Sequence, residues 1–169
     1  MEAKEFIRTA LESIQRNLEP VLDGLTQAEV KHQPAQDLNS IGLILFHTAR
    51  SEDFFVQELM RGKPQVWEKS RWYVTFNVPI EERGRHYKAE QVNAFVSPDL
   101  GELRGYFVAV RRETLDYLGS LNPEDFHRNI KTPRGETTVG GFFSNIISHA
   151  AQHTGEMSYL RGLQRGLNK

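Results

Sequence analysis

The sequence predicts an all-α protein, a four-helix bundle with a long, partly irregular connection between its second and third helices. Two observations support this fold class. Apolar residues recur every three or four positions in four long segments, which is the period of one face of an α-helix. Between the second and third of these segments, residues 62–97 lose that period, and a candidate strand at 72–76 is too short and isolated to form a sheet.

The first long helix is expected near residues 6–25. Its apolar face consists of Phe6, Ala10, Leu11, Ile14, Leu18, Val21, Leu22 and Leu25. Thr26 followed three residues later by Glu29 matches a capping box, in which each residue satisfies a backbone N–H of the other. A short helical turn should therefore follow the first helix.

The second long helix should begin at Asn39 or Ser40, because both residues are good N-caps. Its apolar face consists of Ile41, Ile44, Leu45, Thr48, Phe55 and Leu59. Arg61 and Gly62 are typical of a helix C-terminus, where a cation complements the helix dipole and glycine ends the helix.

The connection over residues 62–97 contains both tryptophans and the basic run 83–88. A connection of this length is usually functional or packed by its own side chains. Residues 90–95 are expected to form a short helix. Trp72, Tyr73 and Phe76 form either a lid over a cleft or a satellite packing cluster, and the sequence leaves both readings open.

The third long helix is predicted from Ser97 as N-cap and Pro98 as the first helical residue. Its apolar positions are Leu100, Leu103, Phe107, Val110, Thr114, Leu118 and Leu121. A short turn should start at Asn122, and residues 133–136 read as another turn. The fourth helix begins near Thr138, with an apolar face made by Val139, Phe142, Phe143, Ile146, Ala150, His153, Met157, Leu160 and Leu163.

Composition narrows the classes of function. A chain of 169 residues fits one domain spanning 1–169. The absence of cysteine excludes disulfides, thiolate metal sites and cysteine nucleophiles. A formal net charge of −1 argues against a nucleic-acid partner, since Glu81 and Glu82 flank the basic run. No apolar run approaches the roughly 20 residues of a membrane span, and no secretory leader is visible, so a cytoplasmic location is the default expectation.

Two histidines with metal-ligand spacing lie in the predicted fourth helix. His149 and His153 are four residues apart, so on a helix their Cβ atoms lie about 6 Å apart and two ring nitrogens can converge on one ion. Glu156 shares that face and can fix the tautomer of a ligating histidine. The alternative is that this pair of histidines arose by chance and binds no metal. Ala150 excludes a zincin, whose motif requires glutamate at that position.

His47 is the candidate for a third ligand. It lies in the second helix on a face with Leu43 and Ile44, so it and His153 are both expected to be buried. Taken alone, His47 is better explained as a core histidine that is hydrogen-bonded to a hydroxyl than as a ligand. The remaining histidines are expected to be solvated: His32, His86 and His127.

The order and helical placement of these motifs produce a resemblance over essentially the whole chain. A histidine within residues 45–52, followed about a hundred residues later by His149, His153 and the Gly155–Glu156 pair, resembles the DinB-like family of metalloenzymes. The resemblance implies one divalent ion, zinc or nickel, bound by His47, His149 and His153 in a cleft of the bundle. Family members often have glutamine in place of Glu156, so this carboxylate either orients His153 or becomes a fourth ligand. Glu52 matches an acidic position of the family and is expected to have a structural or supporting role.

Such a site suits two reaction classes. Three neutral histidines leave a divalent ion with an open position, where the pKa of bound water falls to about 7 and a thiol deprotonates readily. Hydrolysis is one possibility, and transfer of a low-molecular-weight thiol onto a small electrophilic substrate is the other, which the resemblance implies. An anion clamp is expected from Arg50, Arg71 or Arg134, although arginines are ordinarily solvated.

Two readings without catalysis stay open beside the enzymatic one. In the first reading, the chain is a metal-binding stress-response protein without turnover. In the second, it is an interaction module. The aromatic-rich connection suits the self-complementary contact of a homodimer.

Overall fold

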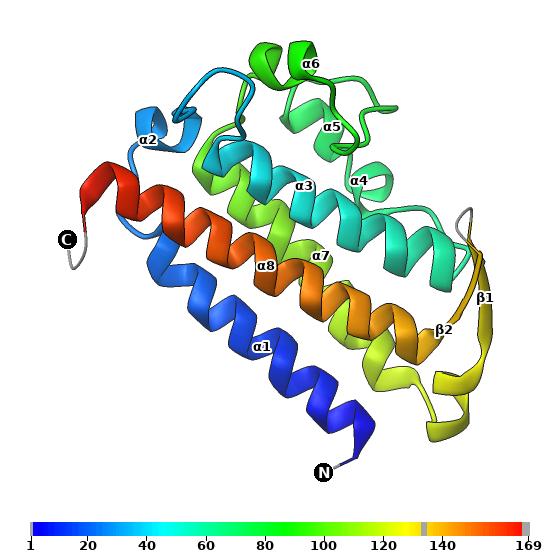
Figure 1. The fold of residues 1–169 in the computed structure, drawn as a ribbon. Helices are drawn as coiled ribbons and strands as arrows, with labels where there is room; N and C mark the ends of the chain where they lie inside the picture. The colour runs from blue at the N-terminus through cyan, green and yellow to red at the C-terminus, as the bar shows by residue number, and fades with distance from the viewer. Residues whose placement is uncertain (1, 133–134, 167–169) are drawn as a thin grey trace.

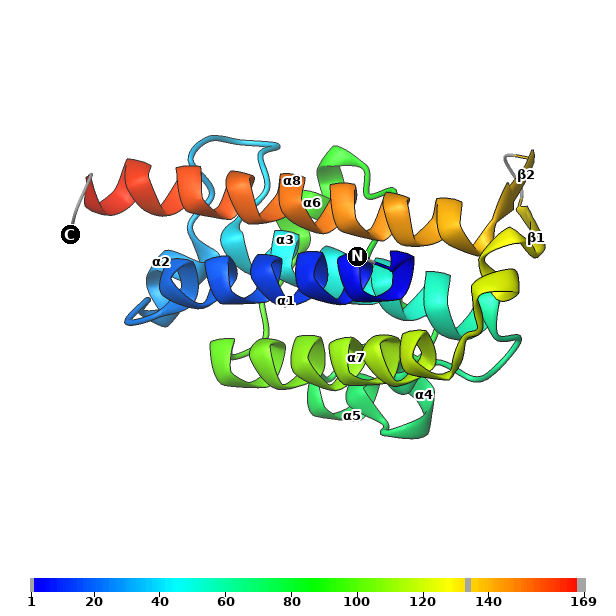
Figure 2. The ribbon, with the colours of Figure 1, turned by 90° about the horizontal axis from the view of Figure 1, so that it is seen from below.

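The computed structural model describes residues 2–132 and 135–166 of the chain. Four long helices lie side by side in this part of the protein (Figure 1): α1 (Ala3–Leu22), α3 (Ile41–Asp53), α7 (Leu100–Ser120) and α8 (Val139–Arg165). Helix α1 packs mainly against α8, while α3 packs against both α7 and α8. The view from below places α1 between α8 and α7 (Figure 2). The predicted all-α bundle is confirmed.

Short elements occupy the connections between the long helices. They are α2 (Gln27–Lys31), the π-helical segment η1 (Phe54–Met60), α4 (Val66–Lys69), α5 (Trp72–Thr75), α6 (Ala89–Ala94) and the 3₁₀ segment η2 (Pro123–His127). The short helices predicted after Thr26 and near residues 90–95 are thus present. The second long helix does not stay α-helical to Leu59 as predicted, because its last turns adopt the wider π-helix.

A small hairpin that the sequence analysis did not predict precedes α8. Strand β1 (Asn129–Thr132) pairs antiparallel with β2 (Gly135–Thr138), with Asn129 opposite Thr138. Each strand has four residues, which is too short to show an alternating pattern in the sequence. Of the turn predicted at 133–136, residues 133 and 134 lie outside the described residues.

Side-chain caps mark most of the predicted helix starts. Thr26 and Glu29 form the expected capping box, and the Ser40 hydroxyl accepts a hydrogen bond from the Leu43 N–H at 3.2 Å. The Thr138 hydroxyl accepts one from the Gly141 N–H at 3.1 Å. Helix α7 starts later than predicted. Its cap is Asp99, whose carboxylate accepts from the Gly101 N–H, since the Ser97 hydroxyl donates to the Pro98 carbonyl instead.

The aromatic residues of the long connection pack inward. The ring centroids of Trp67 and Phe76 each lie 5.6–5.8 Å from that of Tyr106 on α7, and both rings also contact Phe46 on α3. Trp72 and Tyr73 are partly buried against the same cluster. The structure therefore shows the packing cluster and not the lid.

Two residues of the predicted apolar faces point to solvent instead. Phe6 is 59% exposed, because the buried positions of α1 run through Ile7, which lies about 100° further around the helix. Leu163 is 56% exposed, because it falls six residues after the fully buried Met157 and so on another side of α8.

In the part of the chain that the structure describes, no helix is both long enough and apolar enough to cross a membrane.

A buried ion pair joins α3 to α7. Glu52 and Arg111 have side chains that are 3% and 1% exposed, and they form two hydrogen bonds of 2.7 and 2.8 Å. Arg111 also donates to the Leu11 carbonyl at 2.7 Å, which ties α1 to the same pair. The expected structural role of Glu52 agrees with this geometry.

We expect Arg111→Met to destabilise the protein by about 3–5 kcal/mol, because it leaves the Glu52 carboxylate buried and unpaired. Urea unfolding followed by circular dichroism measures this loss. Arg112→Met, at the exposed neighbouring position, is the control and should change the free energy of unfolding by less than about 0.5 kcal/mol. Equal effects of the two substitutions would contradict the assigned role of the ion pair.

Candidate metal centre

Three histidines meet where α3 packs against α8. His47 comes from α3, whereas His149 and His153 lie one turn apart on α8. The Nε2 atom of His149 lies 3.1 Å from Nε2 of His47 and 3.2 Å from Nε2 of His153. Among the described residues, these three form the group of histidine and acidic side chains that can hold a metal ion. The structure thus brings together all three residues predicted as ligands.

Hydrogen bonds on the outer side of two rings determine their tautomers. Nδ1 of His47 lies 2.7 Å from the Gly84 carbonyl oxygen, which can only accept, so the proton of neutral His47 resides on Nδ1. Nδ1 of His153 likewise donates to Oε2 of Glu156 at 2.6 Å. Both rings therefore turn an unprotonated Nε2 toward His149.

This arrangement fits a bound cation. The two inward lone pairs face His149, whose Nε2 carries at most one proton, so at least one nitrogen has no hydrogen to accept from it. Nitrogens that share one ion at about 2.0–2.1 Å with tetrahedral angles lie about 3.3 Å apart. The observed separations of 3.1 and 3.2 Å are close to that value. The cluster can hold a metal ion on this geometry.

Burial keeps the cluster ready to bind a cation. Desolvation, reinforced by the neighbouring imidazoles, lowers the pKa of His149 to about 4. Burial also lowers the pKa of His47. Metal ligation requires neutral imidazole, and these shifts favour the neutral form at pH 7.

Glu156 lies behind His153, away from the other two rings. Its Oε2 contacts Nδ1 of His153, and its Oε1 accepts a hydrogen bond from the Gln152 amide at 2.9 Å. Burial opposes ionisation of this carboxyl, but the hydrogen bonds from Gln152 and His153 hold its pKa below the ordinary value. Both oxygens of the carboxylate are therefore engaged.

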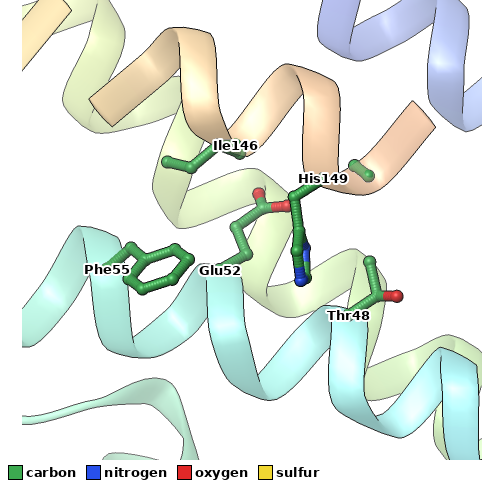
Figure 3. A pocket seen from close by; sticks show the side chains of 6 residues that line it. Thr48, Glu52, Phe55, Ile146 and His149 are labelled. Carbon is green, nitrogen blue, oxygen red and sulfur yellow. The ribbon is translucent and has the colours of Figure 1, made fainter. Parts of the chain in front are cut away.

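A small void and a larger cavity flank the three histidines. The void lies between α3 and α8 and does not admit a water molecule; Figure 3 shows Glu52 and Phe55 facing Ile146 and His149 across it. The cavity, of about 220 Å³, is lined by His47 and His153 together with Asn39, Leu43, Ile44, Gly84, Arg85, His86, Tyr87 and Val92. The cluster thus borders a dry space at His149 and an open cavity at His47 and His153. His47, His149 and His153 are all partly buried, whereas the sequence predicted His47 and His153 to be buried.

Two of the three arginines predicted as an anion clamp, Arg50 and Arg71, lie away from the cavity. Arg50 is buried: its guanidinium donates to the Glu82 carbonyl, the Gln65 side chain and the Tyr106 hydroxyl, and it stacks 4.4 Å above the Trp67 ring. Arg71 is exposed at the start of α5, with a left-handed backbone. Neither residue lines the 220 Å³ cavity, and Arg134 lies outside the described residues.

Three residues of the connection line the cavity although the sequence did not identify them as site residues: Arg85, His86 and Tyr87. His86 is exposed, as predicted, yet it faces the cavity that contains His47 and His153. Its positive φ of 59° is uncommon for a residue other than glycine and is a feature that clusters at functional sites. The only indication in the sequence was the length of the connection, because its return to α3 depends on tertiary packing.

The low pKa of His149 predicts a pH-dependent stability of the metal-free protein. The unfolded residue takes up a proton near its ordinary pKa of 6.5, whereas the folded residue does so only near its pKa of about 4. The free energy of unfolding should therefore fall as the pH is lowered from 6.5 toward 4. Urea titrations with a chelator present measure this slope, and His149→Gln should make it shallower.

His32→Gln is the matched control, because His32 is exposed and lies outside the cluster. It should keep the slope of the parent protein. Identical slopes for the parent protein and His149→Gln would show that the folded state does not exclude a proton from His149.

Comparisons with known proteins agree with this fold. A family model described as the DinB superfamily matches residues 10–157. A solved structure titled "Crystal structure of the conserved protein of locus from Enterococcus faecalis" superimposes with a TM-score of 0.85 at 23% identity, covering 96% of this chain and 97% of that one. At this identity the likeness shows the fold alone. None of the curated proteins compared with the chain matches it. The family match spans most of the chain and all three histidines, and the chain therefore belongs to the DinB superfamily.

Proposed function

We propose that this protein is a metal-dependent enzyme that acts on a small electrophilic molecule. One divalent ion, zinc or nickel, is held by His47, His149 and His153, and the reaction is transfer of a low-molecular-weight thiol or hydrolysis. The observation that carries the proposal is the cavity of about 220 Å³ that opens on His47 and His153. A purely structural metal site is ordinarily closed by four protein ligands, whereas a catalytic one keeps an open position.

The donor set supports the nature of the ion. Three imidazole nitrogens suit zinc, nickel, copper or iron better than magnesium or calcium, which prefer oxygen ligands. When bound, such an ion lowers the pKa of a water or thiol at its open position and so supplies a nucleophile at neutral pH. The chain contains no cysteine, so a thiol in the reaction comes from outside the protein.

The residues around the histidines have supporting roles. Glu156 keeps the proton of His153 on Nδ1, and the Gly84 carbonyl does the same for His47. Because both oxygens of Glu156 are already hydrogen-bonded, we assign this carboxylate the orienting role and not that of a fourth ligand. Outer hydrogen bonds of this kind also raise the basicity of the ligating nitrogens.

The cavity indicates the size and character of the substrate. Its volume lies below the range of about 300–1,000 Å³ that is usual for drug-sized ligands, so the substrate is compact. Leu43, Ile44 and Val92 provide an apolar wall, while Asn39 and His86 provide hydrogen-bonding groups. A small molecule with an apolar body and one polar end matches this lining.

Protein purified without a histidine tag should contain about one equivalent of a divalent metal. His47→Ala, His149→Ala and His153→Ala should each reduce the bound metal sharply, because two imidazoles hold an ion far more weakly than three. Elemental analysis after dialysis provides the measurement, with His127→Ala at an exposed position as the control. Unchanged metal content in His47→Ala would refute the three-histidine site.

An open coordination position should be visible in the cobalt-substituted protein. Adding azide or a small thiol is expected to change the visible spectrum, and a thiol should give a sulfur-to-metal charge-transfer band. Val92→Phe fills part of the cavity and should abolish the thiol band without loss of cobalt. The control is Val108→Phe on the exposed side of α7.

A spectrum that no thiol and no azide alters would mean that the metal is fully coordinated. The non-catalytic metal-binding alternative would then be favoured over the enzyme.

A further inference from the structure

We infer that Glu82 and Gly84 are positioning residues, which together fix the ring of His47 for metal binding. Both belong to the 82–87 turn, defined here as residues Glu82 to Tyr87 of the connection between η1 and α7. This inference rests on the proposed metal site and adds to it a part of the chain that lies far from α8 in the sequence.

Within the described residues, Gly84 is the hydrogen-bond partner on the outer side of the His47 ring. Its carbonyl oxygen lies 2.7 Å from Nδ1, and the residue is buried. Because the carbonyl only accepts, its position decides which nitrogen of His47 carries the proton and which faces the metal site. A displacement of this carbonyl would free the ring to rotate or to change tautomer.

Glu82 holds Gly84 in place through both its main chain and its side chain. The Glu82 carbonyl accepts hydrogen bonds of 3.0 and 3.2 Å from Arg50, one turn after His47 on α3. The carboxylate accepts a hydrogen bond from the Gly84 N–H at 2.8 Å. Two hydrogen bonds from Arg50 therefore hold the Glu82 backbone against the helix that carries His47, and the Glu82 side chain holds the Gly84 backbone.

Glycine is required at position 84 for two reasons. The backbone has a φ of +62°, which residues with a Cβ atom rarely adopt. A Cβ atom there would lie 2.9 Å from Cγ of Arg50 and 3.0 Å from Cε1 of Phe46. Phe46 is packed between Trp67, Phe76 and Phe95, so it cannot yield, and the turn itself must move away from His47.

The same turn also forms one wall of the cavity through Arg85, His86 and Tyr87. The 82–87 turn therefore both orients the His47 ring and forms the wall that faces the substrate. Loss of an outer hydrogen bond typically weakens metal binding 10–100-fold. We expect a change of that size when the turn is released from His47.

The test compares zinc affinity, measured by chelator competition, in the parent protein and in Glu82→Ala, Glu82→Gln and Gly84→Ala. Glu82→Ala and Gly84→Ala should raise the Kd for zinc about 10–100-fold. Glu82→Gln should keep most of the affinity, since its amide oxygen can still accept a hydrogen bond from the Gly84 N–H. Glu81→Ala, at the exposed neighbouring position, is the control and should leave the Kd unchanged.

A second readout distinguishes positioning from general stability. In the metal-free protein, ¹⁵N correlation spectra of the histidine rings report which nitrogen of His47 carries the proton. The parent protein and Glu82→Gln should show it on Nδ1, whereas Glu82→Ala and Gly84→Ala should show a mixture of tautomers. A residue that only stabilised the fold would lower the melting temperature without changing this tautomer.

Unchanged zinc affinity and an unchanged His47 tautomer in folded Glu82→Ala would overturn the inference. A parent protein that binds no zinc would instead refute the proposed function. The tautomer measurement needs no metal, so in that case it still decides whether Glu82 and Gly84 position the ring.

Discussion

The contact between α3 and α8 brings Nε2 of His47 and Nε2 of His153 to within 3.1 and 3.2 Å of Nε2 of His149, and the rest of the site depends on this constraint. Neutral rings oriented by Gly84 and Glu156 cannot satisfy one another there, because two of the inward nitrogens carry lone pairs and no proton. Such an arrangement is costly in an empty protein and favourable around a cation. A bound cation would explain both the two inward-facing lone pairs and the cavity that borders His47 and His153.

Several polar side chains of α3 are buried, and their hydrogen bonds hold the helix that carries His47 in position. Glu52 pairs with Arg111 of α7, while the Asp53 carboxylate accepts from the Val66 and Trp67 N–H groups and from the Tyr106 hydroxyl. Burial raises the pKa of Asp53, and the hydrogen bonds work against that shift. Because an incompletely satisfied network would be strongly destabilising, these contacts define one position of α3 relative to α7 and the connection. The position of His47 in the cluster therefore depends on contacts that lie outside the cluster.

The candidate site was predictable to the extent that it lies on regular helices. His149 and His153 follow from the spacing of four on one helix, and Glu156 from its place on the same face. His47 entered through its helical position and a family resemblance, since nothing local distinguishes it from a core histidine. The cavity wall at 85–87 and the role of Gly84 were not predictable. They depend on how the irregular connection, in which Arg71, Asn77, Gly84 and His86 have positive φ, folds back onto α3, and no period in the sequence encodes that path.

The sequence by itself determined the four long helices, most of their caps and the pair of histidines on α8, because these features depend on contacts between residues three or four positions apart. Only the tertiary structure decided that Arg50 is a buried structural residue at the base of the 82–87 turn. It also decided that a dry void and an open cavity lie on different sides of the histidines. These features arise from packing between segments dozens of residues apart, where side-chain volume and hydrogen-bond geometry, rather than local periodicity, select the arrangement.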